Sequence, residues 1–112
     1  MSGSGFVKLM RTERTLALMA NPNAFTLASV IAYRAQRTDT LNVHDLRVGE
    51  ALLGDYDRYG MTESQYRTAK KNLAKWRIAT FRATNRGTIA TLLDDTVYDS
   101  IASRITSQLT DR

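Results

Sequence analysis

The sequence predicts one mainly α-helical domain that carries a single β-hairpin. Helix-capping residues occur at several points and precede apolar residues at three- and four-residue spacing. Only one pair of β-branched and aromatic runs is joined by a tight turn. A length of 112 residues suits one hydrophobic core, and 43% apolar and 24% charged residues are ordinary proportions for a globular protein.

The N-terminal part predicts two helices. We expect residues 1–5 to be a flexible tail and residues 6–10 to form a short strand or an extended arm. Thr12 is placed to cap a helix that runs to about Ala20, and Asn21-Pro22 starts a second one. Arg34 is expected outside the buried face of that second helix or at its edge. The face itself ends near Arg37 and comprises Phe25, Ala28, Ile31, Ala32 and Ala35.

The middle of the chain predicts the two helices of a helix-turn-helix. Residues 46–53 suit a short strand or turn, and residues 54–60 suit one or two helical turns, in which Asp55 and Asp57 favour capping. Thr62 with Gln65 forms a capping-box pattern that starts a third helix, which we expect to end near Trp76.

The C-terminal part predicts a hairpin and a last helix. Residues 78–83 and 88–93 are the expected strands, joined by Thr84-Asn85-Arg86-Gly87. We expect Asp94 and Asp95 to cap a helix over residues 95–112 that packs on the domain or forms a homodimer. Residues 6–94 then make up the main domain. The apolar stripe of the last helix comprises Val97, Ile101, Ile105 and Leu109.

The positive charge is confined to one segment. Residues 62–87 contain seven basic residues and one acidic residue, whereas the other 86 residues have a net charge of −1. A third helix followed by a hairpin therefore carries the whole excess of the +5 chain, which favours an anionic polymer such as double-stranded DNA as the partner.

Helical periodicity divides the third helix into two faces. Tyr66, Ala69, Leu73 and Trp76 are expected to face the core, with Lys70 at the edge. The outer face and the hairpin offer side chains that suit phosphates and base edges. The expected DNA-contacting residues are Ser64, Gln65, Arg67, Thr68, Lys71, Asn72, Lys75, Arg82, Asn85 and Arg86.

Other classes of function find little support in the sequence. The chain has no cysteine, no phosphate-binding glycine loop and no metal-ligand or catalytic spacing, so we expect neither enzyme activity nor a cofactor. His44 suits a surface position, and the aromatic residues suit the core better than base stacking. No apolar run could cross a membrane, which predicts a cytoplasmic, nucleoid-associated protein.

Three segments carry a resemblance to a known family, namely residues 46–56 (LRVGEALLGDY), 62–70 (TESQYRTAK) and 80–88 (TFRATNRGT). They resemble the winged helix-turn-helix domains at the N-termini of phage and mobile-element replisome organisers, and residues 84–89 (TNRGTI) look like the wing of that family. The resemblance implies binding to origin or regulatory DNA, with replication or transcription proteins as candidate partners; in longer members of the family a further region recruits the replicative helicase or its loader. A transcriptional regulator, or an interaction module of the same fold, remains an alternative.

Overall fold

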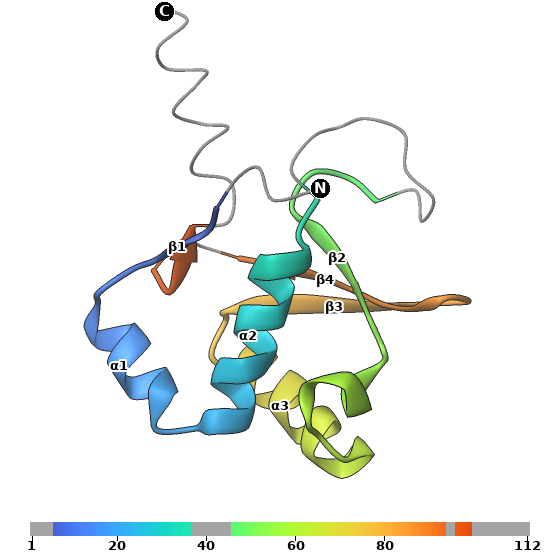
Figure 1. The fold of residues 1–112 in the computed structure, drawn as a ribbon, viewed down its shortest axis with the longest axis horizontal. Coiled ribbons are helices and arrows are strands. Elements are labelled where there is room, and N and C mark those ends of the chain that lie inside the picture. Colours follow the sequence, from blue (N-terminus) through green and yellow to red (C-terminus); the bar gives the residue numbers. More distant parts are fainter. Residues whose placement is uncertain (1–5, 37–45, 94–95, 100–112) are drawn as a thin grey trace, which may run out of the picture.

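The computed structural model is an α+β protein in which three α-helices pack with a three-stranded antiparallel sheet (Figure 1). It describes residues 6–36, 46–93 and 96–99. The elements in chain order are β1 (Lys8–Leu9), α1 (Glu13–Met19), α2 (Pro22–Arg34), β2 (Glu50–Leu53), the 3₁₀ helix η1 (Tyr56–Tyr59), α3 (Glu63–Lys75), β3 (Ala79–Thr84), β4 (Gly87–Leu92) and β5 (Tyr98–Asp99). The expected tail, residues 1–5, lies outside the described residues.

The first two helices begin where the sequence predicts. The side chain of Thr12 accepts a hydrogen bond from the backbone N–H of Thr15, and that of Asn21 accepts one from Ala24. Each cap satisfies an N–H group that the helix itself cannot, and Pro22 at the first helical position has no N–H to lose.

Helix α2 lies at the centre of the core. Leu27, Ala28 and Ile31 are completely buried, and α2 contacts α3, β2 and β4. The predicted face is confirmed except at Phe25, which is only partly buried. Leu27 is also buried, although the predicted face did not include it. Because α2 packs against a helix and a sheet together, more of its circumference is buried than a single contact would require.

The predicted hairpin is confirmed as β3 and β4, and a third strand, β2, extends it into a sheet. The sheet order is β2-β4-β3, with Ala51 and Phe81 both opposite Ala90 on the central strand. Residues 46–53 therefore supply a strand, β2, which follows a bend at Gly49 with φ of +86°. This third strand makes the protein α+β, so the expectation of a mainly α-helical fold is too narrow.

The last helix is not found where it was expected to begin. Val97 is buried in the core, and Tyr98–Asp99 form β5, which pairs antiparallel with β1. The Met10 N–H donates to the Val97 carbonyl at 2.8 Å, so the backbone beside β1 holds this segment extended. The expected capping residues Asp94 and Asp95, and the other stripe residues Ile101, Ile105 and Leu109, lie outside the described residues.

Candidate nucleic-acid interface

Helix α3 is fixed at its start by a complete capping box. The Thr62 side chain accepts from the Gln65 N–H at 3.2 Å, and the Gln65 amide oxygen accepts from the Thr62 N–H at 2.9 Å. The predicted cap is therefore confirmed. Its consequence for recognition is that the Gln65 side-chain oxygen is already used within the protein.

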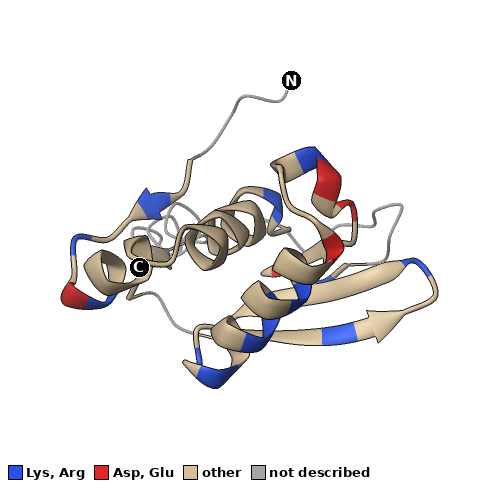
Figure 2. Cartoon of the chain, turned by 90° about the horizontal axis from the view of Figure 1, so that it is seen from below, with Lys and Arg blue, Asp and Glu red and all other residues tan. Residues whose placement is uncertain are grey.

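The two faces of α3 differ as the periodicity predicts. Tyr66, Ala69 and Leu73 are buried against the core. The opposite face is exposed, and basic residues recur along it (Figure 2). Its exposed members are Ser64, Arg67, Thr68, Lys71 and Lys75, and Asn72 beside them is half-buried.

The basic side chains of α3 are not equally available. Arg67 forms an ion pair with Glu63 at 2.7 Å one turn earlier, and the Lys70 ammonium lies 4.5 Å from the centroid of the Tyr66 ring. Within the described residues, Lys71 and Lys75 have no ion-pair partner. These two lysines are consequently the cations of α3 best placed to meet an incoming anion.

Trp76 is not a core residue, contrary to the predicted stripe. It is the C-cap of α3 and is 38% exposed. Arg77 follows it in the left-handed conformation, with φ of +59°, and the Ile78 N–H donates to the Leu73 carbonyl at 2.9 Å. This Schellman turn ends the helix, so helical spacing no longer governs where Trp76 points.

The hairpin turns over two residues, Asn85 and Arg86, both of which are exposed. The Thr84 hydroxyl accepts from the Arg86 N–H at 3.2 Å and stabilises the turn. At Gly87 φ is +141°, and a Cβ there would collide with the Leu53 carbonyl oxygen, so only glycine lets the hairpin lie this close to β2.

Arg82 lies on a different face from the α3 cations. Phe81 packs against the core cluster that includes α3, and successive strand residues point to opposite sides of a sheet. Arg82 therefore points to the outer face of the sheet, where it pairs with Glu50 at 3.2 Å. The structure thus does not place Arg82 beside Lys71 and Lys75, although the sequence analysis grouped them.

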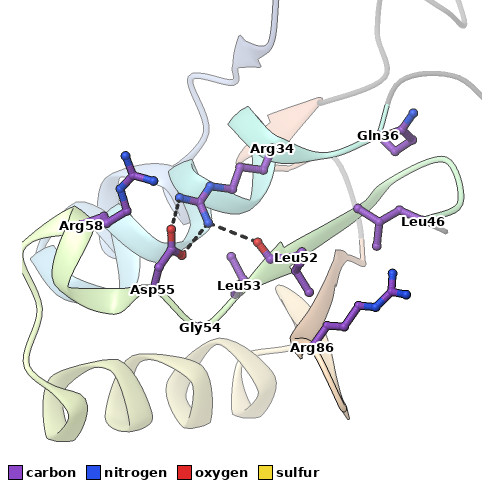
Figure 3. Close-up of a pocket in the computed structure, with 9 residues that line it drawn as sticks. All are labelled: Arg34, Gln36, Leu46, Leu52, Leu53, Gly54, Asp55, Arg58 and Arg86. Atoms are coloured by element: carbon purple, nitrogen blue, oxygen red, sulfur yellow. Dashed lines mark hydrogen bonds and ion pairs between the residues drawn. The ribbon is translucent and has the colours of Figure 1, made fainter. Parts of the chain in front are cut away.

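A cluster of arginines around β2 was not predicted as a site. Arg34, Arg58 and Arg86 line a cavity of about 630 Å³ (Figure 3). Arg34 donates to both carboxylate oxygens of Asp55, at 2.7 and 2.8 Å, so Asp55 makes an ion pair rather than the expected side-chain cap. This bonding lowers the pKa of Asp55 and raises that of Arg34.

Three tyrosines fasten η1 to α3. The Tyr56 ring stacks on Tyr66 at 5.3 Å between centroids, and Tyr59 meets Tyr66 edge-on at 6.3 Å. Burial raises the pKa of Tyr59 to about 12 and raises the pKa of Tyr66 in the same direction. The rings of this cluster are packed against one another between η1 and α3.

The described part of the chain offers neither a cluster of metal ligands nor a single membrane-spanning helix. Over residues 6–36, 46–93 and 96–99, the acidic side chains form no group of three that could hold a metal ion. His44, for which a surface position is expected, lies outside the described residues. In the same ranges no single helix is long and apolar enough to span a membrane. Helices α1 and α2 pass that test only as a pair, across a bend of 119°.

Comparisons with protein-family models, with curated proteins and with solved structures found no match for this chain.

Proposed function

We propose that the chain is a winged helix-turn-helix domain that binds duplex DNA through α3 and the tip of the β3–β4 hairpin. The passage of the chain from α3 directly into a hairpin supports this proposal, although the order of the helices as a whole does not match that of a winged helix. The sheet order β2-β4-β3 places the early strand beside the hairpin, as expected for a wing that is joined to the helical part.

The proposed motif departs from the usual one in its first helix. A four-residue 3₁₀ helix, η1, stands where an α-helix is common, and α1 precedes the whole motif. The turn to α3 is still short, because Gly60 adopts φ of +78° and its N–H bonds to η1 carbonyls. Tyr56 and Tyr66 then hold η1 against α3, which is the relation the motif requires.

The observation that carries the proposal is the exposed face of α3. One side of the helix is anchored in the core, while Ser64, Thr68, Lys71 and Lys75 project from the other. A major groove about 12 Å wide admits such a helix. Lysines at the spacing of one turn suit successive phosphates, and the two hydroxyls suit phosphate oxygens or base edges.

The hairpin tip supplies a second contact to the same duplex. The β3–β4 hairpin extends away from the helices (Figure 1), and its two turn residues, Asn85 and Arg86, are exposed, so they can reach a phosphate or the edge of a minor groove. Arg67 reaches DNA only by leaving Glu63, and that exchange is inexpensive because the pair is exposed.

The biological role that we propose is replication initiation in a phage or mobile element, with transcriptional regulation as the alternative. Selecting bound duplexes from a random pool tests binding and supplies the preferred site together. Enrichment of one repeated sequence supports specific recognition, and recovery of no preferred sequence contradicts it. The alternative of a homodimer through the C-terminal stripe rests on Ile101, Ile105 and Leu109, since Val97, the first residue of that stripe, is buried in the domain core.

A further inference from the structure

The outer face of the sheet carries a second basic surface, separate from α3. Phe81 packs towards the core, so its neighbours Thr80 and Arg82 point to the opposite side of β3. Helix α3 contacts β3 from the core side. A duplex seated along α3 therefore leaves this outer face uncovered.

A groove of about 440 Å³ runs over this outer face near the hairpin tip. Among the described residues, three arginines from three segments line it against one carboxylate. Arg86 is shared with the hairpin tip of the first site, whereas Arg47 and Arg82 are not used there. The polar lining residues are Arg47, Arg82, Arg86, Glu50, Thr84 and Asn85. The apolar side chains among the described lining residues are Leu52 and Ile89.

Glu50 holds this groove in shape without neutralising it. Its carboxylate accepts from the Arg47 backbone N–H at 2.8 Å and from one Arg82 nitrogen at 3.2 Å. The Glu50 side chain is only 17% exposed, whereas the Arg82 side chain is 61% exposed. Arg82 is thus fixed through one nitrogen, and its remaining N–H groups are available to an anion.

We propose that this groove is a second phosphate-backbone site, which holds a second duplex segment while α3 holds the first. The inference rests on the proposed function, because it takes α3 to be the first DNA site. The groove has the arginines and small polar side chains that bind phosphates, and it lacks the apolar centre typical of a protein partner's docking site. These features favour nucleic acid over an acidic peptide.

The test is a bridging assay with the full chain. Two identical duplexes, one labelled with a donor and one with an acceptor, are mixed with protein, and energy transfer is measured beside anisotropy on one duplex. The wild type is expected to bring the duplexes together. Arg47→Glu is expected to lower the transfer at least fivefold and to change single-duplex affinity at most about twofold. The matched control is Arg11→Glu, an exposed residue outside the groove, which should preserve both.

The contrary outcomes separate this inference from the proposed function. A wild type that binds one duplex but gives no energy transfer would overturn the second site and leave the first intact. Equal transfer in Arg47→Glu and Arg11→Glu would also overturn it, because bridging would then arise elsewhere, as in a protein dimer. If Arg47→Glu instead loses only affinity for a polyglutamate peptide, the groove is a peptide site. Failure of the wild type to bind any duplex contradicts the proposed function itself.

Discussion

Arg34 and Asp55, which lie 21 residues apart in sequence, form a bidentate ion pair that joins the end of α2 to the residue before η1. The same guanidinium donates to the Leu52 carbonyl at 3.2 Å and lies 5.4 Å from the centroid of the Tyr59 ring. One side chain therefore connects α2, the outer edge of β2 and η1 (Figure 3). In the proposed motif this contact sets the position of the first helix.

Breaking the pair is expected to destabilise the fold. Arg34→Ala should lower the free energy of unfolding by about 1–2 kcal/mol, because it removes charge-assisted hydrogen bonds from a partly buried site. Urea denaturation measures the loss. In an Asp55→Asn background, Arg34→Ala should lower the free energy of unfolding by clearly less. An equal loss in both backgrounds would show that the ion pair contributes nothing to stability.

The capping box is expected to contribute separately to α3. Thr62→Ala removes the acceptor for the Gln65 N–H and should lower the free energy of unfolding by about 1 kcal/mol. Thr68→Ala is the matched control, because Thr68 is an exposed threonine within the same helix. Thermal denaturation that finds both variants equally stable would contradict the role assigned to the cap.

The left-handed residue at the end of α3 offers a route to higher stability. Arg77→Gly relieves the strain of a side chain at φ of +59° and should stabilise the protein by about 0.5–1 kcal/mol relative to Arg77→Ala. Both variants lose the same charge, so the difference in their stability measures the strain of the left-handed backbone at this position. An alanine variant as stable as the glycine variant would argue against the left-handed conformation.

Tyr59 is expected to make stability fall at alkaline pH. Its pKa is about 12 in the folded protein, whereas an unfolded tyrosine titrates near pH 10. The folded state holds this proton more tightly, so the contribution is complete below about pH 10 and is lost as the pH rises towards 12. Tyr59→Phe should make the decline in denaturation midpoint over this range shallower, and an unchanged decline would assign it to other groups.

The sequence predicted the helix starts and the hairpin turn correctly, because these features depend on residues that lie close together in the chain. The caps at Thr12, Asn21 and Thr62 satisfy N–H groups within three residues, so the sequence contains both partners. The hairpin turn is local for the same reason. Trp76 shows the limit of periodicity, because the spacing continues for one residue after the helix itself has ended.

Contacts between distant residues could not be predicted in this way. Nothing near Asp55 indicates that Arg34 is its partner, and β2 becomes a strand because β4 lies beside it. Arg82 is the clearest case for the candidate site. A count of charges along the sequence groups Arg82 with the basic residues of α3. Side chains alternate between the two faces of the sheet along β3, however, and Arg82 lies on the face away from α3.

The salt dependence of duplex binding tests the central claim most directly. Fluorescence anisotropy should give a steep fall in affinity with salt for the wild type, and Lys71→Ala with Lys75→Ala should reduce the logarithmic slope by about 2, since each lysine neutralises about one phosphate. The control, Lys8→Ala with Arg11→Ala, removes the same charge from exposed positions outside α3 and the hairpin. Its slope should stay close to that of the wild type. Equal slopes for the two double variants would contradict α3 as the DNA-binding helix.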